Sequence, residues 1–132
     1  MESCTEGLLC GTVVSDRKSS GYFKGGLVAS CDEAKMACGV DASVMDQYGK
    51  ESAQIAMAMA NTARRNLRTD VGIGVAGSMN ADANSGEVFV GLSSNEFEKS
   101  FTHRLRGNHS RMKQRAVYAA LFDLMKILLE EV

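Results

Sequence analysis

The chain has 132 residues, of which 45% are apolar, and its formal net charge is −1. This length and composition suit one domain whose hydrophobic core needs neither disulfides nor a structural metal. A net charge so close to zero argues against a nucleic-acid-binding domain and gives no attraction to an anionic membrane surface. We therefore expect neither nucleic acid nor a membrane as a partner.

The sequence carries no visible export or membrane-spanning signal. It has no uninterrupted apolar stretch of the roughly 18 residues that a bilayer requires and no basic-then-apolar leader, so a cytoplasmic location is expected. The 4 cysteines, at positions 4, 10, 31 and 38, form no C-x-x-C pair, and the chain has 2 histidines. These counts predict reduced thiols and no zinc site.

The first half of the chain predicts short helices around one strand. Ser52 is expected to cap the clearest helix, because apolar residues recur every four positions after it as far as Leu67. Shorter helices are expected over residues 5–14 and 32–37, with a helical turn over 41–45, a loop over 15–21 and a strand over 22–29.

The second half predicts strands and one long helix. Strands are expected over residues 71–76, 87–92 and 101–106, a polar loop over 78–85 and the longest helix over 110–131. The alternation of helices and strands predicts a three-layer α/β/α sandwich. Its mixed sheet is expected to be mostly parallel, with an antiparallel member in a hairpin-like passage around residues 87–106.

Ser3 lies at the start of the first predicted helix, where a serine has two interpretations. Its side-chain oxygen can accept a hydrogen bond from a backbone amide of the first turn. Alternatively, its hydroxyl can attack a bound electrophile at the positive end of the helix. The local sequence favours the cap and leaves the nucleophile open.

Few other residues point to chemistry on their own. Gly72-x-Gly74-x-x-Gly77 matches the dinucleotide-binding pattern, but no helix is predicted after it, so we expect only a glycine-lined edge that a ligand can approach. Lys35 taken alone is typical of a solvated surface charge, and His103 of a half-buried strand position. His109, next to Asn108, is a ligand candidate or part of a helix cap. These residues name no reaction by themselves.

Several short motifs occur in the order and spacing of one known family. They are Glu2-Ser3-Cys4-Thr5, Gly21-Tyr22-Phe23-x-Gly25-Gly26, Asp32-Glu33-Ala34-Lys35, Gly39-Val40, Gly49-x-x-Ser52, Met57-Ala58-Met59-Ala60, Gly74-Val75-Ala76-Gly77 and Gly86-x-Val88. On these motifs the chain resembles the C-terminal domain of the CinA family, the nicotinamide-nucleotide amidases, over essentially its whole length.

The resemblance implies a CinA C-terminal-like fold and a hydrolysis that needs neither metal nor cofactor. The carboxamide of nicotinamide mononucleotide would be converted to nicotinate mononucleotide and ammonia. Ser3 is the implied nucleophile and Lys35 its general base, since a carboxamide is a poor electrophile and a lysine can serve where its site lowers its proton affinity. Implied substrate contacts are Thr5, Ser30, Gly74, Ala76, Gly77 and His109. Backbone amides of the glycine edge would hold the substrate or an oxyanion, and a homo-oligomer, first of all a dimer, is expected.

The chain departs from the family pattern around this implied site. Ser30 replaces a tyrosine, Ile73 a threonine, and Asn108-His109 the last two residues of a G-D-R motif whose arginine suits a phosphate. Glu6 replaces a glycine and adds a carboxylate that repels an anionic nucleotide. Loop 78–85 lacks the family's proline, glycines and threonine, and the single domain over residues 1–132 begins without the family's leading helix and strand.

Two hypotheses follow from these similarities and departures. In the first, the chain is an active amidase that uses Ser3 and Lys35 on this or an altered substrate. In the second, it is a catalytically silent relative that binds a nucleotide or serves as an oligomeric interaction module. The Ala- and Met-rich helix around residues 53–67 is then a candidate contact between subunits.

Overall fold

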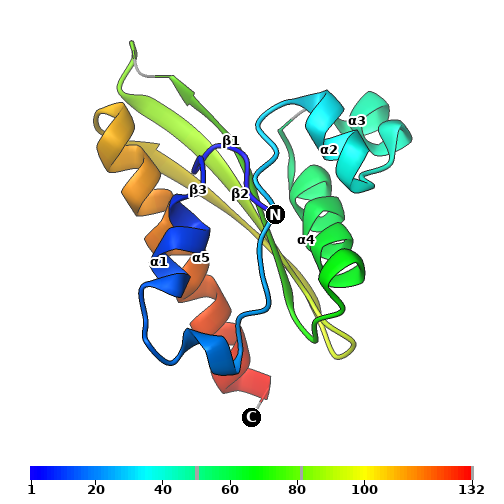
Figure 1. The fold of residues 1–132 in the computed structure, drawn as a ribbon. Helices are drawn as coiled ribbons and strands as arrows, with labels where there is room; N and C mark the ends of the chain where they lie inside the picture. The colour runs from blue at the N-terminus through cyan, green and yellow to red at the C-terminus, as the bar shows by residue number, and fades with distance from the viewer. Residues whose placement is uncertain (50, 81, 132) are drawn as a thin grey trace.

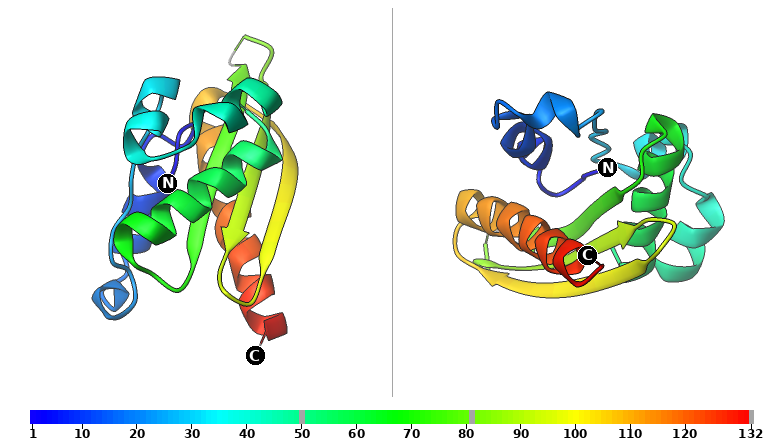
Figure 2. Two further views of the ribbon diagram at one scale, coloured as in Figure 1. Left: turned by 90° about the vertical axis from the view of Figure 1, so that its right-hand side faces the viewer. Right: turned by 90° about the horizontal axis from the view of Figure 1, so that it is seen from below.

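A computed structural model describes residues 1–49, 51–80 and 82–131 and shows three strands between two layers of helices (Figure 1). The strands are β1 (Gly72–Asn80), β2 (Ser85–Ser93) and β3 (Glu98–Arg106), in the sheet order β1-β2-β3. The helices are α1 (Leu8–Val14), the 3-10 turn η1 (Ser19–Gly21), α2 (Asp32–Cys38), α3 (Ala42–Tyr48), α4 (Ala53–Leu67) and α5 (His109–Glu131). Figure 2 shows α1 and α5 on one face of the sheet and α4 on the other, so the predicted three-layer α/β/α sandwich is confirmed.

The prediction of a mostly parallel sheet is wrong. β1 pairs antiparallel with β2, and β2 pairs antiparallel with β3. The connections from Asn80 to Ser85 and from Ser93 to Glu98 are short, and such segments close hairpins but cannot carry the crossover that parallel strands need. The loop predicted over residues 78–85 is therefore shorter than expected, because residues 78–80 complete β1 and Ser85 begins β2. Residue 81 lies outside the described residues.

Parallel pairing occurs only locally along the outer edge of β1, where Glu2 forms parallel bridges with both Val28 and Val75. The Glu2 amide donates to Leu27 at 2.9 Å, and the Ser3 amide donates to the Val75 carbonyl at 3.0 Å. The strand predicted over residues 22–29 is thus reduced to one bridge at Val28. This edge pairing places Ser3 beside the middle of β1.

Helix α4 lies close against the sheet, with six buried residues at positions 55, 56, 59, 60, 62 and 63. The predicted cap is confirmed, because Ser52 Oγ accepts a hydrogen bond of 3.1 Å from the Ile55 amide. The close approach depends on glycine: a Cβ on Gly74 would overlap the Ala56 carbonyl oxygen, and one on Gly91 would lie 2.7 Å from it. The alanines of α4 therefore pack on the sheet, and the predicted association between copies of this chain stays a prediction.

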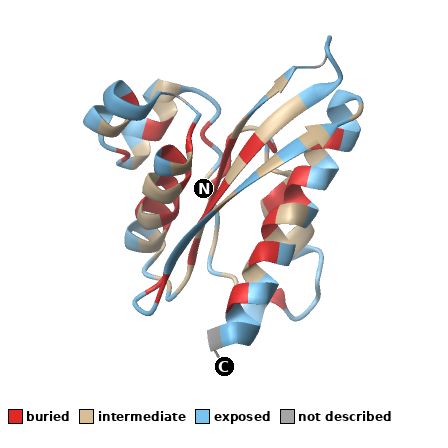
Figure 3. Ribbon diagram, turned by 180° about the vertical axis from the view of Figure 1, so that it is seen from behind, coloured by how far each residue is buried: buried red, intermediate tan, exposed pale blue. Residues whose placement is uncertain are grey.

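Helix α5 covers the opposite face and buries one side of its length (Figure 3). Its buried residues include Met112, Ala116, Val117, Ala120 and Ile127. Over residues 1–49, 51–80 and 82–131, the helices are too short or too polar to cross a lipid bilayer.

Candidate functional site

Five of the predicted site residues meet in one cavity of about 580 Å³ at the edge of β1. They come from separate segments of the chain. Ser3 lies on the N-terminal edge strand, Ser30 just before α2, Lys35 within α2, Gly77 on β1 and His109 on α5. The other lining residues are Cys4, Glu6, Val28, Glu51 and Met79. The fold therefore assembles most of the site that the family resemblance implies.

Ser3 does not cap a helix. Helix α1 begins only at Leu8, after Gly7 at φ 97°, and Gly7 makes no side-chain cap. The Ser3 side chain lies on the edge strand, where its Oγ donates a hydrogen bond of 3.3 Å to the Val75 carbonyl, and the residue is 8% exposed. The cap interpretation is wrong, and Ser3 lines the cavity from a position fixed by strand pairing.

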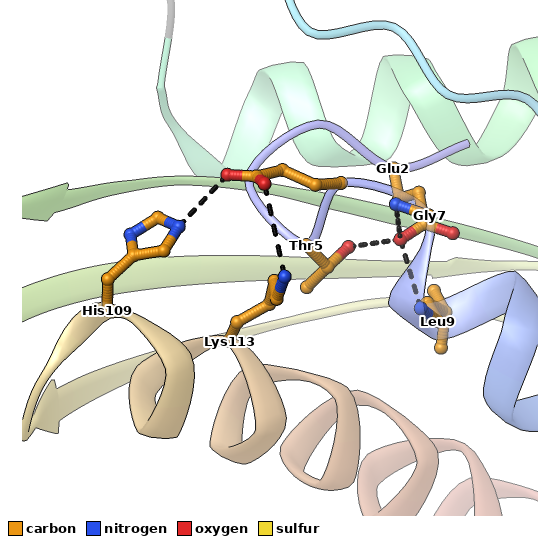
Figure 4. Close-up of polar contacts among 7 residues, drawn as sticks. Glu2, Thr5, Gly7, Leu9, His109 and Lys113 are labelled. Atoms are coloured by element: carbon orange, nitrogen blue, oxygen red, sulfur yellow. Dashed lines mark hydrogen bonds and ion pairs between the residues drawn. The ribbon is translucent and has the colours of Figure 1, made fainter.

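The residue that caps α1 is Glu2, which sequence reasoning missed. Its carboxylate is fully buried and accepts hydrogen bonds from the amides of Gly7 at 3.0 Å and Leu9 at 3.1 Å and from the Thr5 hydroxyl (Figure 4). It also accepts one of 2.8 Å from the amide of Cys10. Burial acts to raise the pKa of Glu2, but the hydrogen bonds from Cys10, Thr5 and Leu9 outweigh it and lower that pKa below its ordinary value. Glu2 therefore stays ionised and stabilises the positive end of the helix.

The distance in sequence between Glu2 and α1 could not reveal this cap, because the chain reverses direction between Glu2 and Leu8. Glu6 and Gly7 both adopt positive φ, 56° and 97°, and this pair of left-handed residues folds the helix start back onto the edge strand. The one available signal was an acid a few residues before the first predicted helix.

Lys35 lies in α2 and is 4% exposed, so the interpretation as a solvated surface charge is wrong. Helix α2 begins at Asp32 and ends at Cys38, and Gly39 caps it with a φ of 113° that suits glycine. Because Leu27–Ala29 pair with Glu2, the helix that follows carries Lys35 to the cavity that Ser3 lines. Strand pairing and a short helix together bring two residues, far apart in sequence, into one site.

The backbone amide of Gly77 faces the same edge of the sheet as Ser3. Val75 uses its amide and its carbonyl to bond the N-terminal strand, at Met1 and Ser3 respectively, both at 3.0 Å. Alternate residues of a strand direct their amides to the same edge, so the Gly77 amide points to that edge as well. There the N-terminal chain has turned away, since the Ser3 carbonyl already accepts from the Glu6 amide at 3.2 Å. Gly77 can thus present a donor to a bound group next to Ser3.

Three other predicted contacts lie away from the cavity. Thr5 is fully buried and donates its hydroxyl to Glu2, so it supports α1 in place of the predicted substrate contact. Gly74 and Ala76 point to the opposite face of β1 from Val75 and Gly77, because side-chain direction alternates along a strand. Both lie beneath α4, Ala76 fully buried and Gly74 against the Ala56 carbonyl. These glycine and alanine positions serve packing between helix and sheet.

Glu6 forms part of the cavity wall and is held from α5. Its carboxylate lies 3.0 Å from His109 Nε2 and 3.9 Å from Lys113 Nζ. Figure 4 shows His109 and Lys113 reaching from neighbouring turns of α5 toward this carboxylate. His109 therefore lines the cavity as the partner of an acid, and its contact with a substrate stays a prediction.

The Cys4 thiol, next to Ser3, is poorly suited to act as the nucleophile. Burial raises the pKa of the Cys4 thiol to about 12, so the thiolate that would act as a nucleophile is scarce at neutral pH. Burial also raises the pKa of the Cys10 thiol to about 12, with its hydrogen bond to Glu2 acting in the same direction. Among the described residues, no group of three His, Cys, Asp or Glu side chains is placed to hold a metal ion.

Curated proteins are similar to this chain over nearly its whole length. A CinA-like protein of Geotalea daltonii is 33% identical over 134 residues, which cover 97% of this chain and 32% of that protein. A CinA-like protein of Fusobacterium nucleatum is 31% identical over 137 residues, covering 99% of this chain and 33% of that protein. The chain spans about a third of the length of the curated relatives it matches.

Solved structures agree with the sequence matches. The crystal structure of a competence or damage-inducible protein from Enterobacter asburiae has a TM-score of 0.86 at 25% identity, over 96% of this chain and 84% of that chain. A CinA superfamily protein from Escherichia coli, 23% identical, shares the fold with a TM-score of 0.88 over 96% of this chain and 77% of that chain. The sequence model of the CinA C-terminal domain matches residues 1–128, and the chain belongs to the CinA C-terminal domain family.

Proposed function

We propose that this domain is an amide hydrolase of the nicotinamide-nucleotide amidase class, with Ser3 as nucleophile and Lys35 as general base. The observation that carries the proposal is that Ser3 and Lys35, 8% and 4% exposed, line one cavity. A serine hydroxyl becomes an effective nucleophile when a base within reach takes its proton. The substrate group is the carboxamide of a pyridine nucleotide, tested first as nicotinamide mononucleotide, a reaction of the cytoplasmic nucleotide pool.

The reaction runs in two halves. Lys35 Nζ takes the proton of Ser3 as Oγ bonds to the carboxamide carbon, and the Gly77 amide donates to the oxygen that becomes negative. The C–N bond then breaks, and the amide nitrogen leaves as ammonia with the proton from Lys35. Water, deprotonated by the same amine, hydrolyses the resulting serine ester, which releases the carboxylic acid and restores Ser3.

A second candidate function is binding without turnover. The observation that favours it is that Glu6, Ser30 and His109, all of which line the cavity, stand where the family pattern has a glycine, a tyrosine and an arginine, so the surroundings of Ser3 and Lys35 differ from that pattern. In that case the domain would hold a nucleotide or a partner and release no product.

The experiment that separates these functions measures ammonia release from nicotinamide mononucleotide by the purified chain and by its Ser3→Ala variant. Loss of release in Ser3→Ala supports the amidase. Equal background rates in the two proteins, together with calorimetric binding of the nucleotide, would support the binding module. The Cys4→Ala variant is the matched control, because it changes the adjacent residue and keeps the hydroxyl.

A further inference from the structure

We infer that the outward face of α5 is an interface between two copies of this chain, whose α5 helices pack against each other in antiparallel orientation. The inference goes beyond the proposed function, because none of the residues that carry it lines the cavity of Ser3. It also moves the expected contact between subunits from α4, whose buried residues pack on the sheet, to the opposite helix layer.

Helix α5 carries a second apolar face, which points away from the sheet. Its residues on the sheet side, such as Ala120 and Ile127, are buried (Figure 3). On the other side four large apolar residues are exposed: Tyr118 by 63%, Phe122 by 56%, Met125 by 49% and Leu129 by 70%. These four residues, the apolar stripe, follow one another at steps of four, three and four positions, which keeps them on one side of the helix. Packing within the domain therefore accounts for one apolar face of α5 and leaves the apolar stripe exposed.

The apolar stripe has the size and the spacing that a helix pair needs. Its exposed side chains present on the order of 500 Å² of surface, judged from the area of such side chains. A specific interface buries about 800 Å² on each partner, and about two thirds of that area is apolar in homodimers. Alternate steps of three and four residues are the spacing with which the side chains of two helices interlock. The stripe can therefore form the core of a dimer interface of ordinary size.

The antiparallel orientation follows from the charges at the two ends of the stripe. Arg111 and Arg115 are exposed and continue the same spacing toward the start of α5. In a parallel pair each of these arginines would face its own copy, and like charges repel. In an antiparallel pair centred between positions 122 and 125, Arg115 comes within one turn of the partner's Glu130, about 3 Å apart along the axis. The antiparallel pair thus replaces a repulsion by an ion pair at each end.

The side chains of the stripe also match each other in this orientation. Tyr118 meets the partner's Leu129, and Phe122 meets the partner's Met125. Each aromatic ring then packs on an aliphatic or thioether side chain, and a methionine sulfur beside a ring is a favourable contact. Because the same stripe supplies both halves of every pair, a second copy of the chain satisfies it through one two-fold axis.

Analytical ultracentrifugation of the purified chain over a concentration series tests the interface. We expect a dimer that dissociates on dilution. Phe122→Glu and Leu129→Glu should each raise the dissociation constant about a hundredfold or more, because a carboxylate without a partner is costly to bury. Val14→Glu is the matched control, since Val14 is 53% exposed on α1 and lies outside the stripe. It should leave the dimer intact.

Two results of this experiment would overturn the interface. One is a monomer at every concentration, which would leave the stripe to a partner of another kind. The other is a dimer that persists in both glutamate variants. Circular dichroism and urea unfolding check that both variants keep the wild-type fold, as expected for exposed positions.

Disulfide cross-linking tests the orientation. Tyr118→Cys and Leu129→Cys are made separately in a chain whose exposed native thiol is removed by Cys31→Ser, then mixed and oxidised. The antiparallel pair predicts cross-links mainly between the two different variants. Cross-links mainly within each variant would show a parallel pair and overturn the antiparallel arrangement, and a dimer that cross-links in neither way would place the interface elsewhere.

Discussion

The Glu2 carboxylate accepts a hydrogen bond of 2.8 Å from the amide of Cys10, eight residues further along the chain. This contact ties the N-terminal edge strand to the first turns of α1 across the left-handed pair Glu6-Gly7. Ser3 follows Glu2 directly and is bonded to β1 through Val75. The position of the candidate nucleophile thus depends on a buried acid that takes no part in the chemistry.

Replacing that acid should destabilise the domain. Glu2→Gln keeps the shape but exchanges a charged acceptor of several hydrogen bonds for an amide, which leaves one donor badly matched. We expect the free energy of unfolding to fall by about 1–3 kcal/mol at neutral pH, as measured by urea unfolding. Glu130→Gln, at an exposed position, should change it little.

The pH dependence of this effect has a definite sign. Because the pKa of Glu2 in the folded protein lies below the ordinary value of 4.5, its stabilisation is complete above pH 4.5 and disappears as the pH falls through the folded value. The difference in unfolding free energy between wild type and Glu2→Gln should therefore shrink in acid. A difference that grows as the pH is lowered from 4.5 would contradict this role.

Glycine at position 74 should be required for packing. A methyl group there would overlap the Ala56 carbonyl, and β1 and α4 would have to separate. We expect Gly74→Ala to lower the free energy of unfolding by about 1–3 kcal/mol or more. Gly11→Ala is the matched control, because a Cβ there meets nothing within 4 Å on an exposed turn of α1. It should stabilise the helix by about 0.5–1 kcal/mol, and equal losses in both variants would refute the packing argument.

His103 should stabilise a buried carboxylate on α5. Its Nε2 lies 2.6 Å from Asp123, which is 1% exposed, while Lys126 lies 3.7 Å from the other oxygen. His103→Leu removes a hydrogen-bond partner of the buried Asp123 carboxylate. It should lower the free energy of unfolding by about 1–3 kcal/mol, as measured by thermal or urea unfolding. His103→Gln retains a donor and should cost less. An equal cost in the two variants would show that packing of the ring matters and the hydrogen bond does not.

Thiol chemistry should not contribute to turnover. With the pKa of Cys4 raised to about 12, its thiol stays protonated at neutral pH. Cys4→Ala is therefore expected to retain the ammonia release of the wild type within a few-fold. Alkylating reagents at neutral pH should modify the exposed Cys31 first. Inactivation by such a reagent that Cys4→Ala prevents, and Cys31→Ala does not, would contradict the assignment.

Much of the fold could be predicted from the sequence, and the sheet pairing could not. Apolar periodicity located α4 and α5, and the Ser52 cap was visible because its hydrogen bond is local. Strand direction depends on which segments meet, and apolar runs look the same in parallel and antiparallel sheets. The hairpins became visible only with the true strand ends, since the polar residues Ser78 and Asn80 belong to β1.

The sequence likewise predicts part of the candidate site and misses the rest. Motif spacing brought Ser3, Ser30, Lys35, Gly77 and His109 into the prediction, and the structure gathers them in one cavity. Local chemistry alone misjudged Lys35, because its burial results from strand pairing around Glu2. The glycines of the pattern have different roles, since Gly74 packs against α4 while Gly77 lies against β2 and lines the cavity. Glu2 was missed because its partners follow a reversal of the chain.

The measurement that tests the central claim most directly is acid quenching of the chain during turnover of a pyridine carboxamide, followed by peptide mapping by mass spectrometry. The account predicts an acyl group esterified to Ser3, absent from Ser3→Ala and formed far more slowly in Lys35→Met. Ammonia release by Ser3→Ala at the wild-type rate, or an acyl group found on Cys4, would contradict it.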